Sequence, residues 1–273
     1  MKYAVCNEMF GDMEFGRAMD MLAAQGFGGV EIAPFTLFGD FSPAAVRHGL
    51  FTARSALAAS GLAFAGMHWL FVKPEGLRLL SPGAEQRRRA WDHLNLLLDI
   101  SGELGGGELV FGSPQQRSSQ GTPKSDALLW FTEGLRAAAE YAQKQNSRIL
   151  LEPLPSAVTD VVNTHKEAAE IIAAAGNPGL AGMFDFHNTA DETDPWDALL
   201  DRYWDMLHHI HINETDGAHP AGRGRADFGP AFSLLRRRVF GGWVSLEIFT
   251  TPGDPLRVLR ETMEFLKYWE AVQ

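Results

Sequence analysis

The chain has 273 residues, of which 45% are hydrophobic, so it can bury a large core within one domain spanning 1–273. It carries 24 basic and 34 acidic side chains, and the formal net charge of −10 argues against nucleic acid or an anionic membrane surface as its main partner. Cys6 is the only cysteine, which excludes an internal disulfide and suits a reducing compartment. With neither a signal-peptide pattern nor an apolar run of about 18 residues, we expect a cytoplasmic protein that does not enter a membrane.

Short apolar segments alternate with helix-like segments along the whole chain. The apolar segments, each predicted to be a strand, are Tyr3–Asn7, Gly29–Pro34, Leu62–Leu70, Glu108–Phe111, Ile149–Pro155, Gly182–Asn188, His209–Glu214 and Trp243–Phe249. The helical segments that follow them are Phe15–Gln25, Pro43–Ser60, Glu85–Leu104, a segment with an apolar stripe from Leu128 to Ala138, His165–Ala175, Pro195–Tyr203, and two segments that begin at Gly229 and Pro255. Eight such units predict parallel strands joined by crossover helices, and they favour a closed (β/α)8 barrel over an open doubly wound sheet.

Two common nucleotide-binding motifs are missing from this pattern. No GxGxxG follows the first predicted strand, and no GxxxxGK[ST] occurs anywhere in the sequence. The sequence therefore gives no support to a dinucleotide site or a P-loop.

The longest loop-like segment is Gly112–Ser125, which is rich in Ser, Gln, Gly and Pro. Loops of this length after a barrel strand often close over a site, but a plain solvated loop fits the composition equally well. Arg117 within the segment has two interpretations, as a substrate contact or as a cover for a helix end.

Four predicted strands each carry one side chain that can bind a metal, close to the carboxyl end of the strand. These side chains are Glu152, Asp185, His211 and Glu247. A carboxylate in an apolar strand is costly unless it is paired or bound to a metal, and the carboxyl ends of barrel strands meet at one rim. Strand alternation places His209 and His211 on one face, and we choose His211 because it lies nearer the carboxyl end.

Three carboxylates with one imidazole form an oxygen-rich ligand set. Such a set favours one divalent ion, Mn²⁺ first with Co²⁺ or Mg²⁺ as alternatives, over a structural zinc. Taken singly, each of the four residues could instead be a strand-end side chain that pairs with an Arg or caps a loop. Their shared spacing of about one βα unit makes the metal site the better hypothesis.

Several stretches together carry a resemblance to a known family. They are Leu151–Leu154, Phe184–Asn188, His209–Glu214 with Gly222–Arg225, and Val244–Ile248. Through them the whole chain resembles the sugar isomerase/epimerase family of xylose-isomerase-like TIM barrels, which includes ketose 3-epimerases and hydroxypyruvate isomerases. The resemblance implies that Glu152, Asp185, His211 and Glu247 bind the metal. It also implies that Glu152 and Glu247 act as the catalytic acid and base.

The resemblance further implies a set of substrate contacts. His187 and an arginine, either Arg223 or Arg225, would contact the substrate, and His68 and Glu31 match positions that line the family's pocket. For the last two, a buried and satisfied His and a core-edge Glu are equally consistent.

The sequence also departs from the ketose 3-epimerases, which leaves the substrate open. Gly217 stands where an Arg commonly follows the strand-seven His, and 154–157 lacks the usual acidic residue.

The implied function is a metal-dependent isomerase or epimerase of a small, non-phosphorylated ketose or hydroxy-keto compound, working through a metal-stabilised enediolate. Asp254, in the loop after the last predicted strand, would repel a phosphate. Alternatives are a metal-dependent lyase acting on a keto-sugar derivative, an endonuclease IV-like phosphodiesterase, and a catalytically silent sugar-binding barrel. The expected partner is a small sugar or keto substrate, with no nucleic acid and no membrane. The sequence leaves open whether the chain forms a homo-oligomer.

Overall fold

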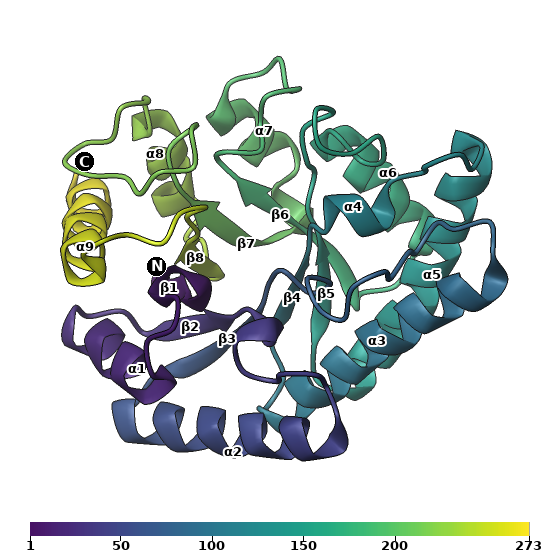
Figure 1. The fold of residues 1–273 in the computed structure, drawn as a ribbon. Helices are drawn as coiled ribbons and strands as arrows, with labels where there is room; N and C mark the ends of the chain where they lie inside the picture. The colour runs from purple at the N-terminus through teal and green to yellow at the C-terminus, as the bar shows by residue number, and fades with distance from the viewer. Residues whose placement is uncertain (273) are drawn as a thin grey trace. The chain divides into compact units, whose positions relative to one another are not determined.

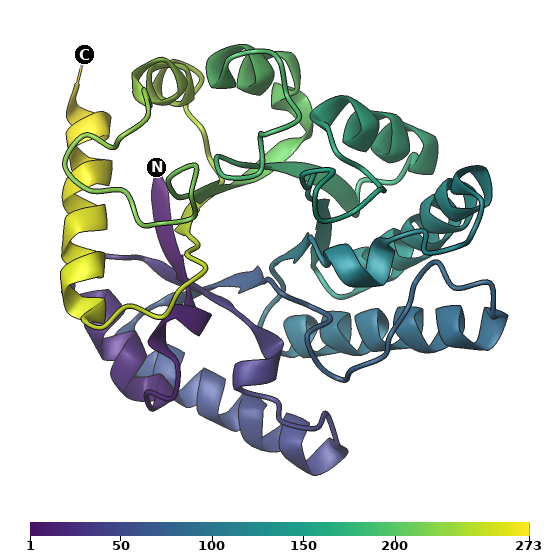
Figure 2. The ribbon, with the colours of Figure 1, turned by 45° about the horizontal axis from the view of Figure 1, so that its top comes forward.

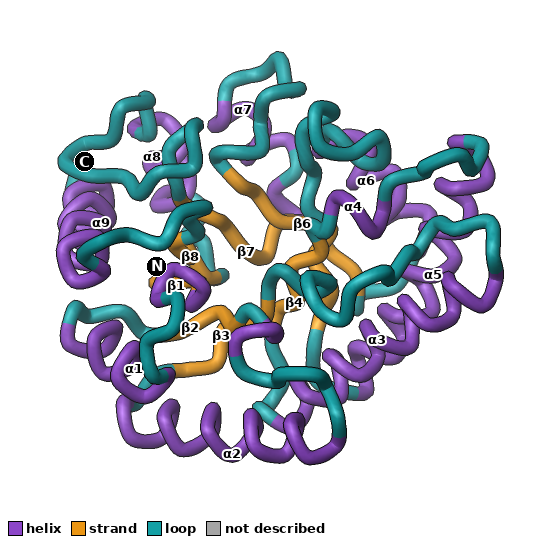
Figure 3. Tube along the Cα trace, in the orientation of Figure 1, coloured by secondary structure: helices purple, strands orange, loops and turns teal. Residues whose placement is uncertain are grey.

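In the computed structural model, which describes residues 1–272, eight strands pair in chain order and close into a barrel, as the fold prediction required. The strands are β1 (Lys2–Cys6), β2 (Gly29–Ile32), β3 (Ala63–Met67), β4 (Glu108–Phe111), β5 (Arg148–Leu151), β6 (Leu180–Asp185), β7 (Leu207–Ile212) and β8 (Trp243–Leu246), drawn in orange in Figure 3. Neighbouring strands run parallel, for example β7 with β8, where His211 lies opposite Ser245. Helices follow the strands, so the class is a (β/α)8 TIM barrel.

The helices of the described residues match the predicted segments, with one addition. They are α1 (Phe15–Ala24), α2 (Pro43–Ser60), α3 (Ala84–Glu103), α4 (Pro114–Arg117), α5 (Lys124–Lys144), α6 (His165–Ala175), α7 (Trp196–Arg202), α8 (Gly229–Arg237) and α9 (Pro255–Ala271), with 3-10 turns η1 (Asn7–Phe10), η2 (Pro34–Thr36) and η3 (Trp204–Met206). The addition is α4, which starts at a proline within the predicted loop. Within residues 1–272, no helix combines the length and the apolar character that a membrane span requires.

Local capping explains where several helices begin. The Thr164 side chain accepts a hydrogen bond from the Glu167 backbone N–H at the start of α6. The Asp254 carboxylate accepts one from Arg257 N–H at 3.2 Å at the start of α9, where Pro255 follows the cap. These caps use short polar side chains directly before an apolar stripe, which is why the sequence located both helices well.

By its internal contacts the chain divides into two compact units. Unit 1 comprises Met1–Ile32, Phe51–Ala65 and Met183–Gln273, and unit 2 comprises Ala33–Leu50 and Gly66–Gly182. The expectation of a single domain over 1–273 stays a prediction.

Unit 1 has a core formed by strands and by the last two helices. β1 pairs with both β2 and β8, and the side chains of Val5, Val30 and Val244 are fully buried. Helices α8 and α9 lie side by side in Figures 1 and 2 and pack through Phe232 and Phe265, whose ring centroids are 5.7 Å apart. Aromatic packing of this kind fixes the helices that support β7 and β8.

Unit 2 is built around the β4–β5 pair and helices α3 and α5, which run side by side in Figure 1. Phe111 of β4 packs against Phe131 of α5 with ring centroids 5.6 Å apart. A side chain at Gly134 would place its Cβ 2.1 Å from the Trp91 ring, so only glycine lets α3 and α5 approach this closely.

The predicted loop over 112–125 is tied down within unit 2. The Gln116 side-chain amide donates to the Phe71 carbonyl at 3.2 Å, and the Thr122 hydroxyl donates to the Leu80 carbonyl at 2.8 Å. The backbone N–H of Ser119 donates to Asp160 at 2.9 Å. The interpretation as a plain solvated loop is therefore wrong, and the lid remains a prediction.

Candidate metal centre

Unit 1 brings three of the four predicted metal ligands together. Asp185 is the last residue of β6, His211 is the penultimate residue of β7, and Glu247 directly follows β8. His211 Nδ1 lies 3.0 Å from Glu247 Oε2 and 3.8 Å from Asp185 Oδ2. The three residues have exposed fractions of 2% for Asp185, 0% for His211 and 4% for Glu247, and their potential ligand atoms lie within 4.8 Å of one another.

The electrostatics of this cluster fit a bound cation. Burial, followed by the negative charge of Glu247, raises the pKa of Asp185 to about 6. Burial disfavours the charged imidazole, but the carboxylates of Glu247 and Glu31 outweigh it and hold the pKa of His211 well above its ordinary value. Two buried carboxylates that destabilise each other gain from a divalent ion, and oxygen with imidazole nitrogen is a donor set that Mn²⁺, Co²⁺ and Mg²⁺ accept. The residues therefore fit the metal that the sequence predicted.

The turn after β6 fixes the orientation of Asp185. Its Oδ1 accepts the His187 backbone N–H at 2.8 Å, and its Oδ2 accepts the side-chain amide of Asn188 at 3.0 Å. The His187 N–H is also 2.9 Å from Asn213 Oδ1, which links this turn to the end of β7. These hydrogen bonds fix the orientation of the carboxylate.

A third buried carboxylate lies on the Nε2 side of the His211 ring. Glu31 of β2 is fully buried, with its two oxygens 3.1 and 3.2 Å from His211 Nε2. His209 Nε2 lies 2.8 Å from Glu31 Oε2. Burial would raise the pKa of Glu31, but the two imidazoles hold it well below its ordinary value.

This contact between Glu31 and two histidines was missed at the sequence level. A usable signal was present, because strand alternation puts His209 and His211 on one face and a Glu within the apolar run Gly29–Ile32 needs a buried partner. The predicted substrate contact of Glu31 remains a prediction.

Glu152 was predicted to lie within the strand Ile149–Pro155; in unit 2 it directly follows β5, which ends at Leu151, and it is buried. Its backbone N–H donates to the Phe111 carbonyl at 3.3 Å. An ideal Cβ at Gly112 would lie 2.3 Å from Glu152 Oε2, so glycine at 112 leaves the room that the carboxylate occupies. The sequence did not indicate this dependence.

Arg117 does not cover a helix end, so that interpretation is wrong, and its substrate contact stays a prediction. The side chain is fully buried in unit 2, where it donates to the carbonyls of Phe111 at 3.3 Å, Glu152 at 2.6 Å and Val162 at 3.1 Å. Burial lowers the pKa of its guanidinium to about 10, against the raising effect of the Glu152 and Glu167 carboxylates. Arg117 therefore covers carbonyls at the ends of β4 and β5, and not a helix end.

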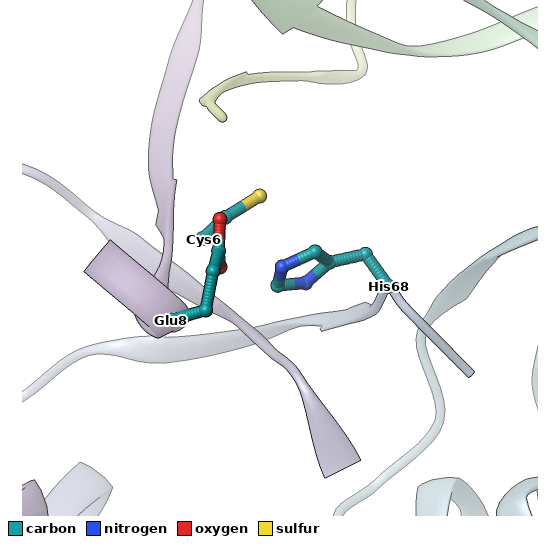
Figure 4. Close-up of side chains that lie close together, drawn as sticks. All are labelled: Cys6, Glu8 and His68. Carbon is teal, nitrogen blue, oxygen red and sulfur yellow. The ribbon is translucent and has the colours of Figure 1, made fainter. Parts of the chain in front are cut away.

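Two predicted substrate-binding histidines lie at or near the ends of strands. His187 is half-buried, with Nδ1 2.8 Å from the Thr215 carbonyl and its ring centroid 4.7 Å from that of Phe249. His68 directly follows β3 in unit 2 and is fully buried. It is drawn in Figure 4, where the thiol of Cys6 at the end of β1 lies beside the carboxylate of Glu8 from η1. The substrate roles of both histidines remain predictions.

The two candidate arginines are exposed and engaged with other groups. The guanidinium of Arg223 lies 5.1 Å from the centre of the Tyr268 ring. Arg225 forms an ion pair with Asp216, and its backbone N–H donates to the buried Glu214 at 2.9 Å. A substrate would have to draw either guanidinium from these contacts, so their role stays a prediction.

Comparison with known proteins confirms the predicted family and fold. The family model described as "Xylose isomerase-like TIM barrel" matches residues 19–269. An apo crystal structure of the 3-keto-D-glucoside 4-epimerase YcjR from E. coli covers 98% of this chain and 99% of its own, with a TM-score of 0.84 and 21% identity. A D-psicose 3-epimerase structure with D-tagatose, from Clostridium cellulolyticum H10, covers 98% of both chains with a TM-score of 0.79 and 19% identity.

A curated relative is similar in sequence over a shorter range. A fructoselysine 3-epimerase of Escherichia coli O157:H7 is 24% identical over 185 residues, which are 65% of this chain and 66% of that protein. The match thus spans just under two thirds of the relative's length.

Proposed function

Because this chain belongs to the xylose isomerase-like TIM barrel family, we propose that it is a divalent-metal-dependent epimerase or isomerase of a small ketose or hydroxy-keto compound. The observation that carries the proposal is the buried convergence of Asp185, His211 and Glu247 at the ends of β6, β7 and β8. The similarity to a fructoselysine 3-epimerase supports a sugar-derived substrate. Mn²⁺ is the favoured ion, because carboxylate oxygens outnumber nitrogen in the ligand set.

We propose Glu152 as the fourth ligand on the strength of the family resemblance. It directly follows β5, as Glu247 directly follows β8, and it is buried. In a barrel the carboxyl ends of consecutive strands share one rim, which is where catalytic residues of this architecture lie.

The chemistry divides between the ion and the two glutamates. Asp185, His211, Glu247 and Glu152 would hold a divalent ion, which would polarise the substrate carbonyl and make the proton on the adjacent carbon more acidic. In this proposal Glu152 and Glu247 approach that carbon from different faces. One glutamate accepts the carbon-bound proton and the other returns a proton to the opposite face, which inverts the carbon centre. Return by a single glutamate to the neighbouring carbon would instead give aldose–ketose isomerisation.

The proposed substrate carries no phosphate. In barrels that bind phosphorylated substrates, the phosphate usually lies at a helix N-terminus that follows the last strands. Here the start of α9 is occupied by the chain's own Asp254 carboxylate, which accepts the Arg257 N–H. A phosphate at this position would meet a negative charge and a donor that is already used.

Proton exchange provides the test of the function. Protein stripped of metal and reloaded with Mn²⁺ is incubated in deuterated water with a panel of ketoses and with hydroxypyruvate, and NMR follows exchange at the carbon next to the carbonyl. We expect exchange that requires the ion and is lost in His211→Ala and Asp185→Asn. The matched controls, His48→Ala on α2 and Asp20→Asn on α1, change exposed residues and should leave exchange unchanged. Cleavage of DNA at abasic sites without exchange on any substrate would refute the proposal.

A further inference from the structure

Glu31 presents a problem that the proposed catalytic cycle leaves unexplained. All four residues of β2 are buried, and the three others, Gly29, Val30 and Ile32, are small or apolar. A carboxylate in such a strand loses its hydration, and a buried charge needs a partner to offset that cost. Within unit 1 its oxygens lie 2.8 Å from His209 Nε2 and 3.1 Å from His211 Nε2.

The geometry assigns Glu31 and His209 a common role as a positioning pair for His211, an inference that rests on the proposed metal site. On one side of the ring, His211 Nε2 lies 3.1 Å from Glu31 Oε1. On the other side, His211 Nδ1 lies 3.0 Å from Glu247 and 3.8 Å from Asp185. A carboxylate can only accept hydrogen bonds, so in the metal-bound state, where the imidazole is neutral, Glu31 would hold its proton on Nε2 and leave the Nδ1 lone pair to bind the ion.

His209 keeps the Glu31 carboxylate from rotating. Its Nε2 is 2.8 Å from Oε2, so both carboxylate oxygens lie against an imidazole nitrogen. The two histidines come from the same face of β7, since they are two residues apart in a strand. One strand thus supplies the metal ligand and the group that fixes the orientation of its partner.

Cys6 of β1 lies next to the same group of side chains. It is paired in register with Glu31, and its Sγ lies 3.9 Å from His211 Nε2 and 3.6 Å from Ser245 Oγ. Cys6, Glu31 and His211 could in principle hold a second ion. Both Glu31 oxygens are, however, already within hydrogen-bonding distance of imidazole nitrogens, which favours the positioning role.

Two substitutions of Glu31 separate positioning from mere packing. Glu31→Leu keeps the approximate volume and removes the acceptors. Glu31→Gln keeps one acceptor oxygen but turns the other position into a donor, so the N–H groups of His209 and His211 cannot both be accepted as before. One of the two imidazoles must then change tautomer.

The measurements are Mn²⁺ affinity by calorimetry on metal-stripped full-length protein and the ¹⁵N NMR tautomer signals of its histidines. We expect Glu31→Leu to weaken Mn²⁺ binding by about 10- to 100-fold, the usual cost of losing the outer partner of a metal-bound histidine. We expect Glu31→Gln to shift a tautomer of His209 or His211, with smaller weakening. Glu133→Leu, an exposed position on α5, is the control.

Specific results would overturn the inference. Wild-type affinity in Glu31→Gln with unchanged tautomer signals would refute it, and this variant serves the test even where Glu31→Leu does not fold. Binding of two equivalents of Mn²⁺ or Zn²⁺ by the wild type, reduced to one by Glu31→Leu, would assign these residues to a second ion instead. Wild-type protein that binds no ion would refute the metal site itself, which distinguishes failure of the proposed function from failure of this inference.

Discussion

Gly112→Ala should strongly lower the activity of the protein, because it displaces the Glu152 carboxylate without altering its chemistry. An added Cβ would lie 2.3 Å from Glu152 Oε2, whereas ordinary contacts between such atoms are longer than about 3 Å, so the carboxylate must move by about 1 Å. The atom that must move is the end of a side chain, so we expect a loss of stability of about 1 kcal/mol, near the low end for overpacking. A shift of about 1 Å in a catalytic group can cost about 10²-fold in rate, and that is the fall in kcat we expect.

The assay combines turnover of the best substrate, Mn²⁺ affinity and thermal unfolding. Gly241→Ala is the matched control, because a Cβ at that exposed glycine meets no atom within 4 Å. Wild-type kcat and Mn²⁺ affinity in Gly112→Ala would refute the reasoning, since Glu152 would then be neither ligand nor base. A large drop in melting temperature together with the loss of activity would instead assign the effect to packing.

Three further predictions follow from the site. Saturating Mn²⁺ at about 100 times its Kd should stabilise the wild type by about 2.7 kcal/mol, seen as a higher Tm, and should leave the Tm of His211→Ala unchanged. Glu247→Gln should lower kcat by about 10²-fold while calorimetry still detects bound metal. The control Glu133→Gln, at an exposed position on α5, should behave as wild type. Loss of activity only in step with loss of metal would make Glu247 a ligand alone. Fructose should give a higher kcat/KM than fructose 6-phosphate, and Asp254→Asn should narrow that difference; a wild-type preference for the phosphate would show that the α9 terminus is open to it.

The barrel could be predicted from the sequence because its signal is repeated eight times. Each strand must be apolar to be buried between its neighbours and the helices, so the pattern recurs at every βα unit. Strand ends were predicted less well. The third strand was predicted to run to Leu70, but β3 ends at Met67. Trp69 adopts a left-handed φ of 51°, which a strand cannot accommodate.

The proposed metal ligands could be recognised in the sequence, whereas the buried side chains that hold them in place could not. Asp185 stands out because it is the one polar residue of an apolar strand, and that contrast can be seen locally. β7 carries three histidines, and His211 was chosen among them for its position near the carboxyl end. Arg117 gives no such signal, because it lies in a polar segment where an exposed arginine is the ordinary expectation. Its burial against the carbonyls of β4 and β5 depends on how α4 folds back, which spacing alone does not determine.

The supports have a common physical basis, which is that a metal ligand must be held before the ion arrives. Arg117 donates at 2.6 Å to the backbone carbonyl of Glu152, and Glu31 lies 3.1 Å from the ring of His211. Both are fully buried charges, so each would be destabilising if its partners were absent. Such charges are better explained by the fixed orientation they impose on a neighbouring ligand than by a contribution to fold stability. On this argument we expect Arg117→Lys, which keeps the charge but loses the planar fork, to lower the free energy of Mn²⁺ binding more than the free energy of unfolding of the metal-free protein, measured from its Tm. A larger loss in the free energy of unfolding would make Arg117 a purely structural residue.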